Sequence, residues 1–375
     1  MKTSQIIWDF PTRAFHWLLV LTVAGGLITG FLAPDSWLMI HVWFGTAVLA
    51  LITFRLIWGL VGSYHSRFSS FIYSRRETRD HILGLLKRKP SKHLGHNPLG
   101  ALMIFILIGT LLVITLSGFV VLGGEEKQGP LAGVVPYFIG KGVEDIHETL
   151  AGFLLFLIGG HLFGVVVESL LSKENLAKSM VTGRKAIPDI DSDNTDTVKG
   201  GVHRGVSVAG VVGLVVVLAL FLIGIPTISG AVTESVIPTD VSNTQYSTEC
   251  GDCHHAFHPS LLPKESWFKM MNELDNHFGE DASLDGKVVQ SLEAFLINNS
   301  SEIWDTRAAN LFRNVNPKKP LQITATKRWK HIHEDVPDTA FQHKLVGTKT
   351  NCAGCHSATQ VGMFADYTVQ MPKGF

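Results

Sequence analysis

Long apolar runs constrain this chain more than any other feature of its sequence. A run of about 20 apolar residues is long enough to cross a lipid bilayer as one helix, and the first 228 of the 375 residues contain five such runs. They cover approximately Ala14–Leu32, His41–Val61, Pro98–Leu122, Val143–Val167 and Gly205–Ile228. We therefore predict an all-α fold, in which a transmembrane helical bundle precedes a mostly helical domain outside the lipid.

Basic residues predict the orientation of these helices. Lys and Arg gather between the second and third runs and between the fourth and fifth. The turn Ala33–Ile40 has none, and only Lys127 and Lys141 precede the fourth run on that side. Positively charged loops stay in the cytoplasm, so we expect the N-terminus there and the C-terminal domain outside. No convincing cleavage site follows the first run, which we expect to be retained.

Four histidines at the ends of the runs form two pairs by depth. The fourth run carries His147 and His161, 14 residues apart. On a helix they lie about 21 Å apart along the axis and within about 40° of one face. His16 starts the first run at the cytoplasmic edge, and His41 starts the second at the outer edge. Because a histidine in a membrane is costly without a partner, we predict that His16 with His161 and His41 with His147 ligate two haem b groups. Interfacial histidines that only anchor the helix ends are the alternative.

Two arginines are candidates for contacts with haem propionates. Arg55 is the one charge deep in the second run, 14 residues after His41 and therefore on nearly the same face. An arginine inside a membrane requires an anion, although its side chain can instead snorkel to the cytoplasmic surface. Arg13 is a second candidate. The remaining histidines on the cytoplasmic side are expected to be solvated; they are His65, His81, His93, His96 and His203.

All four cysteines belong to two Cys-x-x-Cys-His motifs. Their members are Cys250, Cys253 and His254, and Cys352, Cys355 and His356. Two thiols at this spacing can form thioethers with the vinyl groups of one haem c, and the adjacent histidine then becomes an axial ligand of the iron. A zinc site is the alternative, but the two pairs are nearly 100 residues apart, against about 15–20 in a zinc ribbon. The predicted position of both motifs outside the membrane, where bacteria attach haem c, supports the haem interpretation.

Further segments between Glu249 and Pro372 point to one family. They are CGDCH, HPSLLPKESW, HFG with DASLD, LQITATKRW, HE and NCAGCH. The combination resembles the bacterial dihaem cytochrome c family, which implies two haems with two histidine ligands each and His277 and His333 as the distal ligands. The chain departs from the family pattern in having His331 close to His333, and the sequence does not decide which distal histidine serves which haem. His255 and His258 are expected to be solvated or to pack in the domain.

The membrane part carries a second resemblance. The segments WDFPTRAFHW, FRLIWGLVGSYHSRF and HNPLGALM, together with the histidine pair of the fourth run, are similar to bacterial cytochrome b561 and the cytochrome b subunit of nickel-dependent hydrogenases. This resemblance covers Trp8 to about Lys185 and implies a four-helix protein that holds two haem b groups and exchanges electrons with quinone. The fifth run is then an addition that carries the chain outward.

These features predict four parts of the chain. Residues 1–185 form the cytochrome b membrane domain, and 186–228 form a cytoplasmic linker with the fifth span. Residues 229–248 form a periplasmic linker, and 249–375 form the periplasmic cytochrome c domain. We expect the protein in a bacterial inner membrane. The zero net charge gives no indication of nucleic-acid binding.

We predict a four-haem electron-transfer protein that connects the quinone pool with a soluble periplasmic cytochrome or redox enzyme. No motif indicates a nucleophile, a general base or a substrate pocket, so the chemistry belongs to the cofactors. Any enzymatic activity is expected to be that of a quinol:cytochrome c-type oxidoreductase. The direction of electron flow, the reduction potentials, the side of the quinone site and the oligomeric state are not determined by the sequence.

Three alternatives remain open at this point. The chain could be the anchor subunit of a periplasmic hydrogenase or dehydrogenase complex that passes electrons to quinone. It could also be a haem-based sensor or ligand-binding protein, which would need a haem with an open coordination position. The third alternative is a membrane protein with a zinc-binding tail and no haem.

Overall fold

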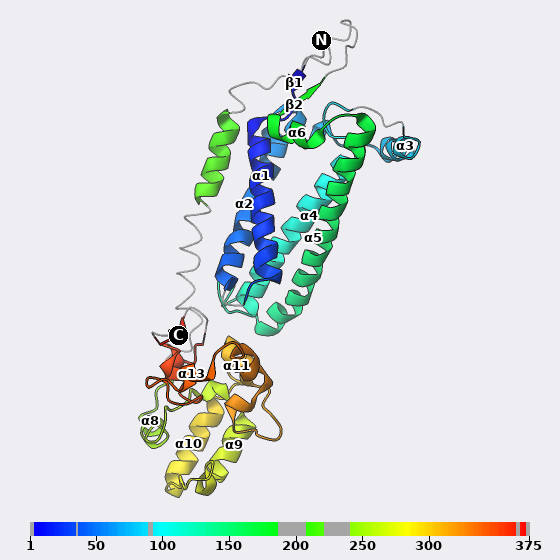
Figure 1. Ribbon diagram of the computed structural model, residues 1–375. Helices are drawn as coiled ribbons and strands as arrows, with labels where there is room; N and C mark the ends of the chain where they lie inside the picture. The colour runs from blue at the N-terminus through cyan, green and yellow to red at the C-terminus, as the bar shows by residue number, and fades with distance from the viewer. Residues whose placement is uncertain are drawn as a thin grey trace, which may run out of the picture. The chain divides into compact units, whose positions relative to one another are not determined.

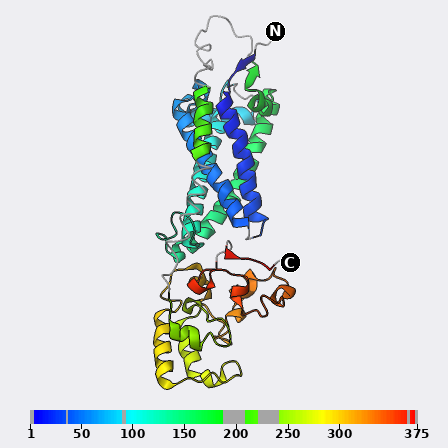
Figure 2. The ribbon, with the colours of Figure 1, turned by 90° about the vertical axis from the view of Figure 1, so that its left-hand side faces the viewer.

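The computed structural model describes residues 4–34, 37–88, 93–186, 208–220, 241–364 and 368–372. They belong to two compact units (Figures 1 and 2). Unit 1 comprises Met1–Phe119 and Val143–Ile228, and unit 2 comprises Val120–Gly142 and Ser229–Phe375. Both are mainly helical, which confirms the all-α fold class. The segment 120–142, which lies within the predicted membrane domain 1–185, groups with the C-terminal residues in unit 2.

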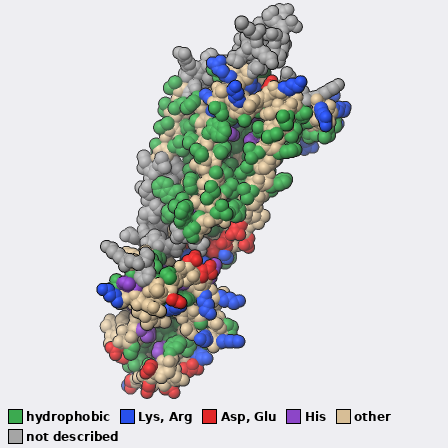
Figure 3. Space-filling view, viewed as in Figure 1, with side chains coloured by type: hydrophobic (Ala, Val, Ile, Leu, Met, Phe, Trp, Pro, Cys, Tyr) green, Lys and Arg blue, Asp and Glu red, His purple; other side chains and the backbone are tan. Residues whose placement is uncertain are grey.

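Among the described residues, four helices are long and apolar enough to cross a membrane. They are α1 (Phe10–Phe31), α2 (Leu38–Val61), α4 (Pro98–Gly124) and α5 (Tyr137–Ser172). Figure 1 shows them side by side, and Figure 3 shows apolar side chains along the bundle. Each coincides with a predicted span, although α5 extends beyond its apolar run at both ends.

The fifth predicted span is described only in its central part, as the helix Val208–Leu220. Leu214 of this helix packs against Phe15 of α1 and against Phe54 and Trp58 of α2. The remainder of the predicted span lies outside the described residues, as do residues 187–207 and 221–240, which include most of both predicted linkers.

Asp9 fixes the start of α1 and joins it to the end of α2. Its carboxylate caps α1 by accepting a hydrogen bond from the backbone N–H of Thr12 at 2.9 Å. The same carboxylate accepts hydrogen bonds from Trp58 Nε1 (3.0 Å), Ser63 Oγ (2.7 Å) and Ser66 Oγ (3.0 Å). Only 1% of the Asp9 surface is exposed. A buried carboxylate is costly unless it is hydrogen-bonded, so these four donors account for its position.

Short elements pack around one end of the bundle. They are β1 (Ser4–Ile6), η2 (Tyr64–Ser66), η3 (Phe68–Ser70), α3 (Arg75–Leu86), α6 (Leu176–Thr182) and β2 (Arg184–Ala186). Strand β1 pairs antiparallel with β2, with Gln5 opposite Lys185. Between α6 and β2, Gly183 has a φ of +77° and ends the helix, a conformation that favours glycine. These contacts join the first residues of the chain to residues far along it.

Unit 2 consists of short helices joined by loops, as predicted. The α-helices are α8 (Thr244–Glu249), α9 (Lys264–Asn272), α10 (Gly286–Asn298), α11 (Arg307–Phe312), α12 (Lys327–Ile332) and α13 (Asp338–Phe341). Single 3-10 turns lie between them: η5 (Pro259–Leu261), η6 (Leu274–Asn276), η7 (Ile323–Ala325), η8 (Cys352–Gly354) and η9 (Thr359–Val361). One apolar cluster joins α9 to α10 through Trp267, Leu292 and Leu296. A second cluster joins η5, α11 and α12.

Replacing Asp9 by Ala should destabilise unit 1 by about 3 kcal/mol, because three buried side-chain donors lose their acceptor and α1 loses its cap. Thermal unfolding in detergent, followed by far-UV circular dichroism, measures the change. Asp80→Ala is the matched control, because it removes an exposed carboxylate that forms ion pairs with Arg76 and Arg79 of its own helix. Equal melting temperatures for the two variants would contradict the role of Asp9.

Candidate haem sites

His41 and His147 face each other in unit 1, from the first turn of α2 and from α5. Their ring centroids are 6.1 Å apart and their planes are inclined by 81°. An imidazole nitrogen binds a transition metal at about 2.0–2.1 Å, so two imidazoles on opposite sides of one iron have centroids about 6 Å apart. The structure therefore brings the predicted outer pair together at a spacing that fits a haem with two histidine ligands.

Both rings of the outer pair are oriented through Nδ1. In His41 this nitrogen lies 3.0 Å from the carbonyl oxygen of Gly26. In His147 it lies 3.1 Å from the carbonyl oxygen of Ile114 and 3.0 Å from Ser117 Oγ. A carbonyl oxygen can only accept, so each Nδ1 donates and Nε2 keeps a lone pair for a metal. These orienting groups could not be predicted, because a backbone carbonyl leaves no signal in a sequence.

Two glycines leave space beside the outer pair. Gly45 lies one helical turn after His41, and nothing is within 4 Å of the place where its Cβ would be. At Gly118, a Cβ would lie 3.2 Å from the His147 ring, closer than most real contacts. Glycine at these two positions fits a flat group beside the histidines.

His16 of α1 and His161 of α5 form the inner pair. The two imidazoles are close enough to interact electrostatically. Nδ1 of His16 is buried and has no hydrogen-bond partner among the described residues. Buried polar atoms are normally partnered, so a bound group beside His16 fits this observation.

The first Cys-x-x-Cys-His motif faces His277. The rings of His254 and His277 are stacked, with centroids 6.1 Å apart and planes inclined by 23°. Nδ1 of His254 lies 2.8 Å from the carbonyl oxygen of His255, which leaves Nε2 of His254 for a metal. His277 is followed by Phe278 and Gly279, whose positive φ values of 54° and 100° form the turn after η6. The structure thus pairs His277 with the motif that begins at Cys250.

The second motif faces His333. The ring centroids of His333 and His356 are 6.3 Å apart. Nδ1 of His333 lies 2.8 Å from the carbonyl oxygen of Trp329, and its ring stacks on the Trp329 indole with centroids 4.4 Å apart. His331 instead forms an exposed ion pair with Glu334 at 3.3 Å. The geometry therefore favours His333 over His331 as the partner of His356.

The cysteines do not form a zinc cluster in the described residues, where no three His, Cys, Asp or Glu side chains converge on one point. Burial raises the pKa of the Cys250 and Cys352 thiols to about 11. Each motif instead has its own facing histidine, as a separate haem site requires.

His255 and His258 connect the segments that follow the two motifs. His255 Nε2 lies 3.3 Å from Thr359 Oγ1. His258 is buried, and its Nδ1 lies 2.8 Å from Ser260 Oγ. A Cβ at Gly362 would lie 2.6 Å from the same Nδ1 of His258. Of the two expected alternatives for these histidines, solvation or packing in the domain, the structure shows packing.

Both candidate arginines contact backbone carbonyls. Arg55 is buried, donates from Nη1 to the carbonyl oxygen of Ser66 at 2.9 Å and lies over the Phe68 ring. It does not snorkel to the surface. Arg13 donates to the carbonyl oxygen of Val181, which joins α1 to α6. A contact of either arginine with a haem propionate stays a prediction.

The expectation of solvated histidines at the basic end of unit 1 is wrong for His81 and His96. His81 of α3 is buried, with Nε2 3.8 Å from the Glu168 carboxylate. His96 lies between the rings of Trp8 and Phe71, each with its centroid 4.5 Å away. Burial lowers the pKa of both, that of His96 to about 3. The basic loops suggested a solvated surface, but the partners of His81 and His96 come from distant parts of the chain. His203 lies outside the described residues.

Comparison with known proteins assigns each half of the chain to a family. Residues 7–183 match the family model of prokaryotic cytochrome b561, and residues 246–364 match that of dihaem cytochrome c. The chain joins a cytochrome b561 domain to a dihaem cytochrome c domain. Haem b and haem c are therefore its cofactors, and it is a membrane electron-transfer protein.

Named relatives exist for both domains. A "Probable Ni/Fe-hydrogenase B-type cytochrome subunit" of Cupriavidus necator is 25% identical over 216 residues, which cover 50% of this chain and 88% of the relative. The "Probable Ni/Fe-hydrogenase 1 B-type cytochrome subunit" of Escherichia coli K12 is 27% identical over 220 residues, which cover 49% and 91%. The solved dihaem cytochrome c of Rhodobacter sphaeroides is 33% identical, with a TM-score of 0.29, and the match covers 35% of this chain and 100% of that one. The solved dihaem cytochrome c of Shewanella baltica OS155 is 30% identical, with a TM-score of 0.28, and the match covers 35% of this chain and 94% of that one.

Replacing His333 by Ala should leave the haem c of the second motif with one protein ligand. We expect a high-spin signal that accounts for one haem of the protein and binds carbon monoxide, because the distal position opens. Visible absorption and electron paramagnetic resonance of the reduced and oxidised protein measure the change.

The matched control for this variant is His331→Ala, which should keep the low-spin spectrum because His331 faces Glu334. A carbon monoxide-reactive haem in His331→Ala and a low-spin spectrum in His333→Ala would reverse the assignment.

Proposed function

We propose that this cytochrome carries electrons across the bacterial inner membrane, between the quinone pool and a soluble periplasmic redox partner, through two haem b and two haem c groups. The observation that supports the proposal is a set of four histidine pairs, two in the membrane bundle and two in the cytochrome c domain. When bound, each haem supplies one-electron chemistry, and the protein sets ligands, spacing and surroundings.

Each residue of the four sites has one task in this proposal. His16 with His161 and His41 with His147 hold the two haem b groups. His254 with His277 and His356 with His333 ligate the two haem c groups. The thioether bonds would come from Cys250, Cys253, Cys352 and Cys355.

Helix α5 sets the spacing of the two membrane sites. His147 and His161 lie on the same unbroken helix, Tyr137–Ser172, so their separation along the axis is about 21 Å. A continuous helix keeps this separation constant, whereas a loop between the sites would not. One helix thus supplies a ligand to each haem b.

Charge supports a cytoplasmic N-terminus. Figure 3 shows Lys and Arg side chains at the end of unit 1 that carries β1, α3 and α6, whereas apolar side chains cover the flanks of the helices. Basic segments remain on the cytoplasmic side of a bacterial inner membrane. Together with the predicted fifth span, this orientation would put the cytochrome c domain in the periplasm, where a soluble cytochrome or redox enzyme could reach it.

A second function keeps the four haems and changes the partner. The curated relatives of the cytochrome b561 domain carry names of hydrogenase subunits, which favours an anchor that passes electrons from a periplasmic hydrogenase or dehydrogenase to quinone. Purification of the protein from its native membrane in mild detergent distinguishes the two functions. A hydrogenase or dehydrogenase should co-purify in stoichiometric amount if the protein is an anchor subunit. A haem-based sensor is disfavoured, because a second histidine near each candidate proximal ligand would occupy the remaining position on a bound haem.

Replacing His147 by Ala should remove one haem b and leave both haem c groups. The molar ratio of haem b to haem c should therefore fall from about 1:1 to about 1:2. Reduction of the haem c groups by a short-chain quinol should slow by at least about tenfold, because one step of the path between the domains is lost. Pyridine haemochrome spectra and stopped-flow absorption provide the two measurements.

Thr149→Ala, an exposed change on the same helix, is the control for this experiment and should leave both quantities unchanged. If dithionite reduces the wild-type haem c groups but quinol does not, the quinone-linked function is contradicted.

A further inference from the structure

The loop between α4 and α5 belongs to the compact unit of the cytochrome c domain. We call residues 125–136 the outer loop; all of them lie within unit 2. Lys127 in this loop has a φ of 53°, the left-handed conformation that L-residues other than Asn and Asp seldom adopt. Glycine is the usual residue at such a position after a helix. A lysine there is conformationally unfavourable, so its side chain requires an explanation.

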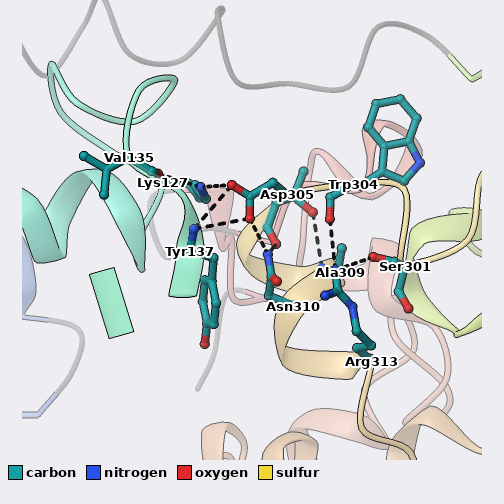
Figure 4. Close-up of polar contacts among 10 residues, drawn as sticks. Lys127, Val135, Tyr137, Ser301, Trp304, Asp305, Ala309, Asn310 and Arg313 are labelled. Carbon is teal, nitrogen blue, oxygen red and sulfur yellow. Dashed lines mark hydrogen bonds and ion pairs between the residues drawn. The ribbon is translucent and has the colours of Figure 1, made fainter. Parts of the chain in front are cut away.

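The Lys127 ammonium group is nearly buried and is held by two acceptors. Only 7% of the side chain is exposed. Nζ donates to the carbonyl oxygen of Val135 at 3.0 Å and to the carboxylate of Asp305, which precedes α11 (Figure 4). The backbone N–H of Tyr137 also lies 3.3 Å from both oxygens of Asp305. Asp305 thus binds both ends of the outer loop.

Asp305 is itself fixed by the cytochrome c domain. Asn310 Nδ2 donates to the Asp305 carboxylate at 2.9 Å. Arg313 donates to the carbonyl oxygens of Ser301 at 2.7 Å and Trp304 at 3.4 Å, which holds the turn before Asp305 (Figure 4). A carboxylate positioned in this way loses little entropy when it binds a cation.

A second ion pair lies next to the first. Arg307 Nε is 2.9 Å from a carboxylate oxygen of Glu126, with 20% and 14% of the two side chains exposed. The two pairs have opposite polarity: the loop supplies the cation to Asp305 and the anion to Arg307. We call these four residues the charge clamp. Alternating signs of this kind fix one register and reject a shifted one.

The charge clamp is connected to a haem ligand by packing. Arg307 starts α11, whose Ala308 and Phe312 pack against Trp329 in one apolar cluster. Trp329 stacks on His333 and accepts its Nδ1 hydrogen bond. The outer loop is therefore attached to the part of the domain that holds the His333–His356 site.

We propose that the outer loop is the docking segment of the cytochrome c domain, and that electron transfer between the membrane haems and the haem c groups requires the charge clamp. The proposal rests on the proposed function for its electron-transfer part. The clamp itself is a structural contact and can be tested without it.

Arg307→Glu places two negative charges together and should release the outer loop. We expect reduction of the haem c groups by quinol to slow by about tenfold, because the outer loop loses its ion pair with α11. The double variant with Glu126→Arg and Arg307→Glu restores opposite charges and should recover the wild-type rate within about twofold. Both variants are measured as full-length, haem-loaded protein by stopped-flow absorption.

Hydrogen exchange gives a second readout that does not depend on activity. In Arg307→Glu the backbone amides of the outer loop and of Tyr137 should exchange faster, and in the double variant they should return toward wild type. Asp338→Lys is the control, because it reverses the sign of a more exposed ion pair with Lys349 in the same unit. It should change neither the rate nor the exchange of the loop.

Two results would overturn the docking proposal. One is wild-type exchange and wild-type rate in Arg307→Glu. The other is a double variant that remains as slow and as rapidly exchanging as the single one, with unaltered haem spectra. Failure of quinol to reduce the wild-type protein would instead remove the proposed function, and the exchange experiment would still test the charge clamp.

Discussion

The hydrogen bond from histidine Nδ1 to a carbonyl oxygen orients both rings of the outer membrane site and one ring of each cytochrome c site. An imidazole has two nitrogens, and only one can face the iron while the other orients the ring. His147 on α5 donates its Nδ1 hydrogen bond to the carbonyl oxygen of Ile114 on α4, and His41 on α2 donates to that of Gly26 on α1. The outer site is therefore assembled only when both helix pairs pack. Cofactor binding and bundle folding stabilise the same arrangement.

In the cytochrome c domain, the carbonyl acceptors of the histidine rings lie close to them in the sequence. His333 uses the carbonyl of Trp329 one helical turn earlier, and His254 uses that of its neighbour His255. These acceptors need no distant part of the chain. Short helices and 3-10 turns are sufficient to orient these rings, whereas the outer membrane site needs contacts between helices. The difference follows from sequence separation, because a contact between neighbours costs little loop-closure entropy.

Features with local periodicity could be predicted, and features that join distant residues could not. The four spans follow from apolar length, and the pairing of His41 with His147 follows from their depth. The burial of His81 and His96 could not be predicted, because Glu168, Trp8 and Phe71 lie elsewhere in the chain. The pairing of β1 with β2 was missed for the same reason. Each strand has only three residues, too few to show an alternating pattern.

The charge clamp is a further contact of this kind, and its small size is consistent with its task. The cytochrome c domain is covalently continuous with the membrane domain, so the chain already keeps it nearby at a high effective concentration. A contact within a tethered pair has to be specific, but it does not have to supply the affinity of a free complex. Two ion pairs of opposite polarity are suited to that task, because ion pairs contribute more to register than to stability. The left-handed backbone of Lys127 fits the same account: a modest local cost is offset by a charge placed where it meets Asp305.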